Sequence, residues 1–250
     1  MNLRCKYVLV TGGSSGIGLA IAKRLAQDGA HIVIAGRREQ RLMNAQREIG
    51  ENCAGYLVWD VSDTSAIHEN IRRAEQMMGG FDGLVNNAAV SCESFGRGYE
   101  PWDITPEEWD QVADADLKGA FFMMREAVDR MRETGRKGNV LNIASNAACM
   151  DIVGPYSTSK LGLLKLTRAL GKRFGSDGII INGIAPGATA TPMISHYCKD
   201  ADAPYERHAL GRFIRPEEIA ELAAYLMSDM GEIICGHTVV ADAGDRAATL

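Results

Sequence analysis

The chain has 250 residues, of which 46% are hydrophobic and 24% charged, which excludes intrinsic disorder because disorder requires low hydrophobicity with high net charge. Lysine and arginine total 27 against 32 aspartate and glutamate residues, so the net charge of −5 provides no basic field for nucleic acid or an anionic membrane. No apolar stretch approaches the ~20 residues of a membrane span, and we expect neither nucleic acid nor a membrane as a partner.

Seven short segments rich in valine, isoleucine and leucine are predicted to be strands, and several are apolar on both faces. Such strands are typical of a parallel sheet that is covered on both sides. In chain order, the predicted strands are residues 6–10, 31–35, 54–59, 82–86, 139–144, 178–184 and 237–240.

Amphipathic segments between these strands are predicted to be helices. Gly29, Gly50 and Gly79 follow three of them, as is typical of a helix C-terminus. Thr105 and Pro106 begin another, with a capping side chain followed by the residue type favoured at the first helical position. In chain order, the predicted helices are residues 17–28, 38–50, 64–78, 105–115, 117–133, 156–174 and 216–228.

The alternation of strand and helix predicts the fold class. Right-handed crossovers between parallel strands lead to an α/β fold, with about seven strands in a doubly wound parallel sheet and helices on both of its faces. No change of composition divides residues 1–250, and a chain of this length can build one core. We therefore predict a single domain.

The six cysteines form no C-x-x-C pair, and a chain of this length does not depend on disulfides, so we predict free thiols in a reducing compartment. The N-terminus runs into the first strand without a charged leader and a long apolar region, and no N-x-S/T acceptor occurs. These features predict a cytoplasmic protein. The five histidines show no metal-ligand spacing, so we expect no metal.

The first predicted strand runs into a glycine-rich turn that opens a helix. Gly12, Gly16 and Gly18 permit a tight turn and close approach of the backbone to a diphosphate, and the helix N-terminus presents free N–H groups to that anion. This context predicts a dinucleotide-binding fold of the Rossmann type. A glycine-rich turn that binds no ligand is the alternative.

The same turn also contains G-x-S-x-G, centred on Ser14, which is typical of the nucleophile elbow of serine hydrolases. A hydrolase would require an acid such as Asp60 or Asp151 and a histidine such as His237 at strand ends. The elbow usually follows several strands, whereas this turn follows the first. The hydrolase hypothesis also leaves Gly18 unexplained.

Tyr156 and Lys160 lie four residues apart at the start of a predicted helix and therefore share one face. A nearby ammonium favours the phenolate, so we expect Lys160 to lower the pKa of Tyr156 from its usual value of about 10 and to make the pair a general acid/base. Ser145 ends the strand 139–144 and could hold a carbonyl oxygen beside the tyrosine. A solvated surface pair and a turn serine are the alternatives.

With these residues the chain resembles the short-chain dehydrogenase/reductase family over essentially its whole length. The matching motifs, in the family's order, are Thr11–Gly18, Asp60-Val61, Asn86-Asn87-Ala88-Ala89, Asn142–Ser145, Tyr156-x-x-x-Lys160, Pro186-Gly187 and Thr191-Pro192. The resemblance implies hydride transfer between a nicotinamide and a secondary alcohol or ketone, with Tyr156 as proton carrier, Ser145 orienting the substrate oxygen and Lys160 on the nicotinamide ribose.

The resemblance also implies the residues that bind the cofactor, with Asp60 and Val61 at the adenine, Asn86 beside the cofactor and Thr191 at the carboxamide. The full set is Gly12, Ser14, Ser15, Gly16, Ile17, Gly18, Arg37, Arg38, Asp60, Val61, Asn87, Ala88, Ala89, Tyr156, Lys160, Pro186, Gly187, Thr189 and Thr191.

Three positions depart from the family's usual pattern. Asp116 stands where an asparagine is usual, and we keep it as a catalytic candidate for a water-mediated proton relay, although its charge would alter the electrostatics around Lys160. Only eleven positions separate Ser145 from Tyr156, which predicts a tight loop on the substrate side. Ala89 replaces the commoner glycine.

The end of the second strand favours NADP(H), while NAD(H) stays possible. A free ribose 2′-hydroxyl favours an acid at this place and a 2′-phosphate favours arginine. Arg37 and Arg38 follow the strand 31–35, and no acid occurs before Glu39. Guanidinium groups pair well with phosphate, although the two arginines could simply be a solvated helix start.

Substrate and assembly are predicted only broadly. Residues 90–104 form a long connection, and residues 190–213, rich in methionine and aromatics, match the family's substrate lid. Small free alcohols and ketones are favoured over acyl chains on an acidic carrier protein, because Asp177 and the net charge of −5 would weaken docking; Arg136 and Lys137 keep that 3-oxoacyl reductase alternative open. A catalytically idle NADP-binding sensor is a further alternative. The resemblance implies a homotetramer or a dimer.

Overall fold

The computed structural model describes residues 3, 5–97, 101–198 and 200–247. Within them, seven strands form one sheet in the order β3-β2-β1-β4-β5-β6-β7, and every neighbouring pair is parallel. This confirms the predicted doubly wound α/β fold. The strands are β1 Tyr7–Thr11, β2 His31–Gly36, β3 Cys53–Val58, β4 Gly83–Asn86, β5 Gly138–Ile143, β6 Ile179–Pro186 and β7 Thr238–Ala241.

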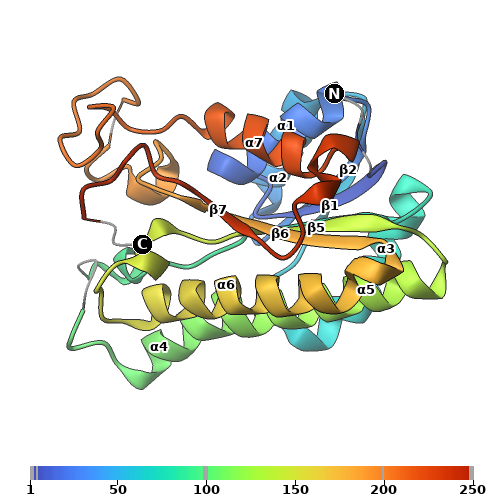
Figure 1. Cartoon of the computed structure of the whole chain (residues 1–250), viewed down its shortest axis with the longest axis horizontal. Helices are drawn as coiled ribbons and strands as arrows, with labels where there is room; N and C mark the ends of the chain where they lie inside the picture. Colours follow the sequence, from blue (N-terminus) through green and yellow to red (C-terminus); the bar gives the residue numbers. More distant parts are fainter. Residues whose placement is uncertain (1–2, 4, 98–100, 199, 248–250) are drawn as a thin grey trace.

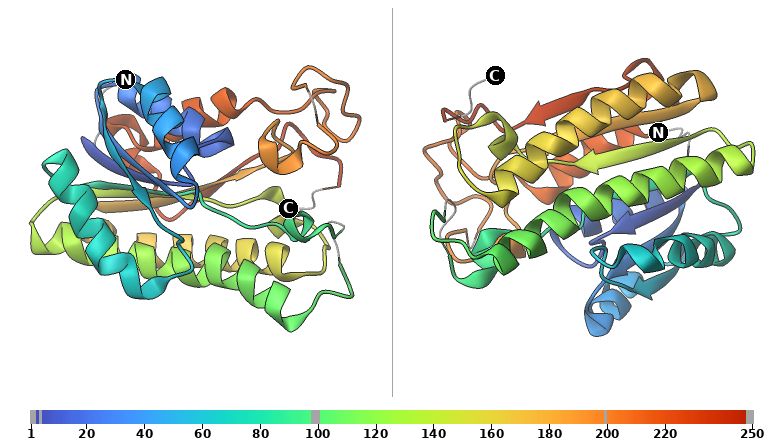
Figure 2. Two further views of the ribbon diagram at one scale, coloured as in Figure 1. Left: turned by 180° about the vertical axis from the view of Figure 1, so that it is seen from behind. Right: turned by 90° about the horizontal axis from the view of Figure 1, so that it is seen from below.

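Helices cover both faces of the sheet (Figures 1 and 2). Helices α1, α2 and α7 lie on one face, and α3, α5 and α6 lie on the other. The helices are α1 Gly16–Gln27, α2 Glu39–Ile49, α3 Ile67–Met78, α4 Pro106–Ala113, α5 Ala120–Glu133, α6 Pro155–Phe174 and α7 Pro216–Leu226.

Side chains of the central strands alternate between the two cores. In β1, Val8 and Val10 pack with α1 and α7, whereas Leu9 packs with α3 and α5. All three are fully buried, and full burial of such a side chain contributes about 1.5–3 kcal/mol. Apolar residues at successive positions are therefore required, which explains the continuous hydrophobic strands of the sequence.

The stretch from α4 to α5 differs from the two separate helices that were predicted. A π-helical segment, Asp114–Gly119, joins them without a break. A π-helical segment shifts the faces of a helix by one residue. This interrupts the hydrophobic periodicity from which a continuous helix is predicted. Gly119 fits this segment closely against a neighbouring loop, because a Cβ atom there would lie 2.4 Å from the Val61 carbonyl oxygen.

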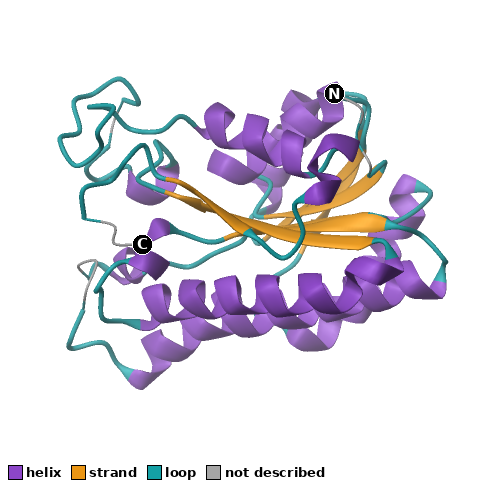
Figure 3. Cartoon of the chain, in the orientation of Figure 1, coloured by secondary structure: helices purple, strands orange, loops and turns teal. Residues whose placement is uncertain are grey.

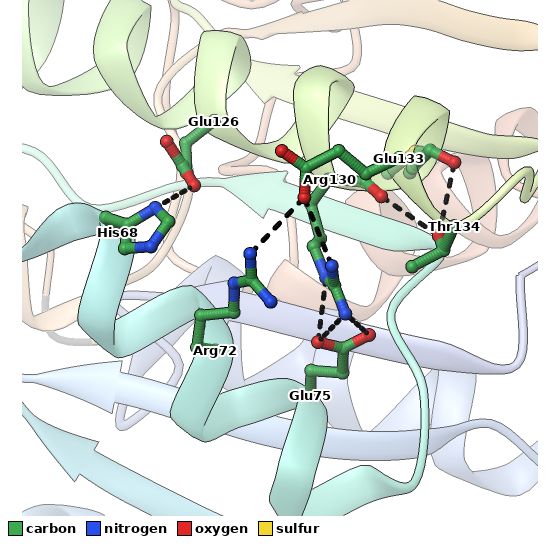
Figure 4. Close-up of polar contacts among 8 residues, drawn as sticks. His68, Arg72, Glu75, Glu126, Arg130, Glu133 and Thr134 are labelled. Atoms are coloured by element: carbon green, nitrogen blue, oxygen red, sulfur yellow. Dashed lines mark hydrogen bonds and ion pairs between the residues drawn. The ribbon is translucent and has the colours of Figure 1, made fainter.

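Polar side chains fix α3 against α5 (Figure 4). The Arg130 guanidinium on α5 donates to both carboxylate oxygens of Glu75 on α3 at 2.8 Å, and both side chains are largely buried. The nearby pairs His68–Glu126 and Arg72–Glu133 are more exposed, and exposed ion pairs contribute at most about 1 kcal/mol each. The Arg130–Glu75 pair is therefore the strongest of these three polar contacts between α3 and α5, and the N-terminus of α5 continues the π-helical segment.

Long irregular segments gather at the carboxyl end of the sheet (Figure 3). The segment after β6 has its own small core, in which the rings of Tyr205 and Phe213 stack with centroids 4.3 Å apart beside Ile194 and Cys198. The predicted connection 90–104 includes residues 98–100, which lie outside the described chain. Within the described residues, none of the helices combines the length and apolar character needed to cross a membrane.

Candidate active site

A cavity of about 950 Å³ opens along the carboxyl ends of the strands. It extends from the glycine-rich turn past the ends of β2, β4 and β5 to the start of α6 and the segment after β6. The sequence-predicted residues that line it are Gly12, Ser14, Ser15, Gly16, Ile17, Arg37, Arg38, Asp60, Val61, Asn87, Ala88, Ala89, Ser145, Tyr156, Lys160, Pro186, Gly187, Thr189 and Thr191.

The glycine-rich turn is shaped by close backbone contacts. Gly12 and Gly16 have φ angles of 65° and 54°, a region that favours glycine. Gly18 does not line the cavity; its missing side chain lets α1 pack on the turn, since a Cβ there would lie 2.5 Å from the Gly12 carbonyl oxygen. The N-terminus of α1 therefore faces the cavity with its free N–H groups.

Two adjacent asparagines at the end of β4 have different roles. Asn87 lines the cavity, and its side-chain amide donates to the Thr11 carbonyl oxygen at 2.9 Å, which braces the glycine-rich turn. Asn86 is buried and donates to Asn142 Oδ1 at 3.0 Å. The expectation that Asn86 lies beside the cofactor is therefore wrong, because its side chain points into the core behind the site.

Ser145 and Tyr156 meet at the carboxyl end of β5. Ser145 is the second residue after the strand and caps a short 3-10 helix, whose Ala147 N–H donates to its Oγ at 3.2 Å. Its hydroxyl is also hydrogen-bonded to the Tyr156 phenol. Tyr156 is the second residue of α6, and Cys92 packs beneath it, with its sulfur accepting from the Tyr156 backbone N–H.

Lys160 follows one turn later on α6 and is 2% exposed. Its Nζ lies 5.4 Å from the centroid of the Tyr156 ring and donates to the Ile143 carbonyl oxygen at 3.3 Å. The buried ammonium is therefore held at the end of β5, next to the tyrosine. The ammonium is neutralised by Asp116, a residue of the π-helical segment.

Asp116 is 1% exposed. Its Oδ2 lies 3.1 Å from Lys160 Nζ, and its Oδ1 accepts the Val90 backbone N–H at 2.7 Å. Burial raises the pKa of Asp116, while the ammonium and the N–H group oppose this. Asp116 does not line the cavity itself; it lies beneath it and joins Lys160 to the loop after β4.

The pKa of Tyr156 is raised rather than lowered, which corrects the sequence-based expectation. Burial is the largest cause, the Asp116 carboxylate adds to it, and the hydrogen bond with Ser145 opposes it. The expectation failed because it left out the burial of the phenol, which is the largest cause, and gave too little weight to the Asp116 carboxylate that the sequence had already indicated near Lys160. With Asp116 at 3.1 Å, much of the field of the ammonium is cancelled at the phenol.

Three arginines surround the opposite end of the cavity. Arg37, Arg38 and Arg41 all line it, and the pKa of Arg38 is lowered by burial and by repulsion from the other two. Asp60 is the nearest acid, with Oδ2 3.7 Å from Arg37 Nη1, and its Oδ1 accepts from Ser62. Crowded cations of this kind favour an anionic ligand.

The residues required for a serine hydrolase are not brought together. Ser14 follows β1 at the carboxyl edge of the sheet, whereas His237 directly precedes β7 and thus lies at the opposite edge of a parallel sheet. Asp151 is exposed and does not line the cavity. The geometry therefore excludes the triad considered from the sequence.

Several cavity residues were missed from the sequence. Arg41 could have been found, since it lies one helical turn after Arg37 and Arg38. Asp245, near the C-terminus, accepts from Asn146 at 3.1 Å and from Arg207 at 3.2 Å and so joins three distant segments. Glu93 and His196 pair at 3.1 Å across the cavity. No local pattern marks these contacts, because they arise only from the tertiary fold.

Space for a dinucleotide beside a buried acid–base group places the chain among the Rossmann-type oxidoreductases, and known proteins identify the family. A family model described as enoyl-(acyl carrier protein) reductase matches residues 12–245. The chain is 32% identical, over 253 residues, to 2,5-dichloro-2,5-cyclohexadiene-1,4-diol dehydrogenase of Sphingobium indicum, and the match covers 98% of this chain and 99% of that protein.

Solved structures agree with this match. A short-chain dehydrogenase from Burkholderia cenocepacia in complex with NADP superposes with a TM-score of 0.84 at 30% identity, covering 96% of this chain and 97% of that one. A 3-ketoacyl-(acyl-carrier-protein) reductase from Brucella melitensis complexed with NADH gives 0.85 at 27% identity, covering 95% and 96%. The chain belongs to the short-chain dehydrogenase/reductase family and is an oxidoreductase, as its motifs predicted.

Proposed function

We propose that the chain interconverts a secondary alcohol and a ketone with NADP(H), using Tyr156 as the proton carrier and Ser145 and Lys160 as its partners. The observation that carries this proposal is the hydrogen bond between the Tyr156 phenol and Ser145 in the cavity that also holds the glycine-rich turn. The cavity fits a dinucleotide, because the turn, the N-terminus of α1 and the three arginines offer donors along its length.

The residues of the chain have separate tasks in this reaction. The bound cofactor supplies or accepts the hydride. The Ser145 hydroxyl orients the substrate oxygen, and the Tyr156 phenol gives its proton to that oxygen during reduction and removes it during oxidation. Lys160 Nζ lies beside the tyrosine and is available to the nicotinamide ribose, while Asp116 holds the ammonium in place.

A panel of alcohols and ketones with NADP(H) and NAD(H) tests this proposal through the change in nicotinamide absorbance. We expect turnover of free secondary alcohols or ketones, faster with NADP(H). Tight cofactor binding without turnover of any compound would support the idle sensor instead. The gathered Ser145, Tyr156 and Lys160 argue against a sensor, because burying the Lys160 ammonium beside the phenol is costly without a chemical use.

Acyl chains on a carrier protein are a second candidate, and a 3-oxoacyl thioester belongs in the same panel. The surface near Gly178 does not favour such a carrier. Asp177 places a carboxylate there and pairs with Arg132 at 3.0 Å. Arg136 lies over the Tyr7 ring and 3.5 Å from Asp82 and so has internal partners, which leaves the exposed Lys137 as the basic residue available to a carrier. The cytoplasmic location, the oligomeric assembly, the single domain and the lid at residues 190–213 stay predictions.

Replacement of Asp116 by asparagine is expected to move the pH profile toward lower pH. The change removes an anion that raises the pKa of Tyr156 and frees the charge of Lys160, so both effects lower that pKa. Oxidation requires the phenolate, so its rate increases as the pH rises through this pKa. The rising limb of the pH–rate profile for oxidation therefore moves to lower pH. Each pH unit of movement raises the rate on that limb about tenfold.

The measurement is the pH dependence of kcat for oxidation and for reduction with one substrate pair. Reduction requires the protonated phenol, so the falling limb of its pH–rate profile should move to lower pH by the same amount. A variant without activity at any pH would show that the carboxylate itself is required. Unchanged limbs would show that Asp116 does not act on Tyr156.

A further inference from the structure

We infer that Glu93 binds a second hydroxyl group of the substrate, so that the preferred substrate is a diol or hydroxyketone rather than a simple alcohol or ketone. This inference rests on the proposed function, whose reacting oxygen lies between Ser145 and Tyr156. It names the group that the substrate presents to the wall of the cavity near Glu93.

Glu93 is placed inside the site by its neighbours. It lies in a short 3-10 helix, Cys92–Phe95, which the contact between Cys92 and the Tyr156 backbone fixes against the start of α6. The Glu93 side chain is only 12% exposed and lines the cavity. Its charge also reaches the Tyr156 phenol, where it contributes to the raised pKa. A substrate that reacts at Tyr156 therefore comes close to this carboxylate.

The carboxylate has room for a further donor. Its ionic partner is His196, whose Nε2 lies 3.1 Å from Glu93 Oε1 and whose side chain is 54% exposed in the segment after β6. A carboxylate offers about four acceptor positions, and among the described residues the contact of Oε1 with His196 leaves the positions on Oε2 for a further donor. Burial also raises the pKa of Glu93, so a donor that stabilises its charge there is favourable.

The surrounding charges disfavour an anionic substrate group. Arg207 also lines the cavity, but Asp245, with a side chain that is 2% exposed, already neutralises it. An anionic substrate group near Glu93 would therefore meet a carboxylate and gain no free cation in return. Met150, Met193 and Tyr197 provide apolar surface in the same region. The carbon skeleton of the substrate would contact this apolar surface, and a hydroxyl beside the reacting carbon would donate to Glu93.

The test compares trans-1,2-cyclohexanediol with cyclohexanol as substrates with NADP⁺. The quantity measured is the ratio of kcat/KM for the diol to kcat/KM for the alcohol. We expect the ratio in the wild-type protein to fall roughly tenfold or more in Glu93→Leu, because a hydrogen bond to a charged group is lost. Glu93→Gln retains an acceptor oxygen without the charge and should give an intermediate ratio.

Two controls separate this role from others. Glu51→Leu removes an exposed carboxylate in the turn before β3 and should leave the ratio unchanged. His196→Asn breaks the ion pair from the opposite side and leaves the carboxylate in place, so the diol preference should persist. Equal loss of preference in His196→Asn and Glu93→Leu would assign the effect to the ion pair and overturn the inference.

The remaining outcomes distinguish this inference from the proposed function. If the wild-type protein turns over both compounds and Glu93→Leu lowers both rates equally, Glu93 has only a structural role, and the proposed function stands. If the wild-type protein oxidises neither compound nor any other alcohol with either cofactor, the proposed function and this inference both fail. A direct binding measurement on Tyr156→Phe with NADP⁺ should show the same diol preference without turnover.

Discussion

Replacement of Tyr156 by phenylalanine is expected to lower turnover by about 10²–10⁴-fold, the usual contribution of a positioned acid or base. The change removes one oxygen atom, which is hydrogen-bonded to Ser145 and is the proposed proton carrier. Cofactor affinity should be nearly unchanged, because the glycine-rich turn and the three arginines that line the rest of the cavity are untouched. The measurement is steady-state turnover together with a cofactor titration.

Tyr225→Phe provides the matched control for this experiment. Tyr225 lies on α7, packs against the core on the other face of the sheet and does not line the cavity. It should retain wild-type turnover and cofactor affinity. Tyr156→Phe with near wild-type rates would remove Tyr156 from the chemistry, and loss of cofactor binding would mean that the phenol supports the fold of the site instead.

The sequence predicted the scaffold of this site well because each motif lies where a strand meets a turn. Gly12 and Gly16 follow β1, Ser145 follows β5, and parallel strands bring these ends to one edge of the sheet. Tyr156 and Lys160 need only the helical spacing of four residues. Local pattern and topology therefore suffice to bring all five residues together.

Electrostatic partners were harder to predict. The sequence placed the charge of Asp116 near Lys160, but the direct ion pair between the two depends on a π-helical segment that the hydrophobic pattern does not reveal. The shift in the pKa of Tyr156 was predicted with the wrong sign because the burial of the phenol, its largest cause, depends on tertiary packing. Glu93 was missed because its partner, His196, belongs to a segment remote in sequence. Contacts of this kind are set by tertiary packing.

Simultaneous replacement of Arg37 and Arg41 by alanine is expected to weaken NADPH binding roughly a hundredfold while changing NADH binding little. Each charge-assisted hydrogen bond contributes about 1.5–3 kcal/mol, or tenfold and more in affinity. The side chain of Arg37 is 67% exposed, so solvent screening places its share at the low end of this range. Only the 2′-phosphate distinguishes the two cofactors, and the loss should therefore be confined to NADPH.

Arg47→Ala is the matched control, since Arg47 is exposed in the last turn of the same helix, α2, and does not line the cavity. It removes one positive charge from this helix, where the double variant removes two, and should leave both affinities unchanged. Salt provides a second check, because screening weakens exposed charge pairs. The preference of the wild-type protein for NADPH should decrease as ionic strength increases, and that of the double variant, which keeps only Arg38, should decrease less. Equal losses for NADPH and NADH would show that the arginines stabilise the end of β2 and do not select the cofactor. An unchanged preference would mean that the 2′-position is recognised by Arg38 alone.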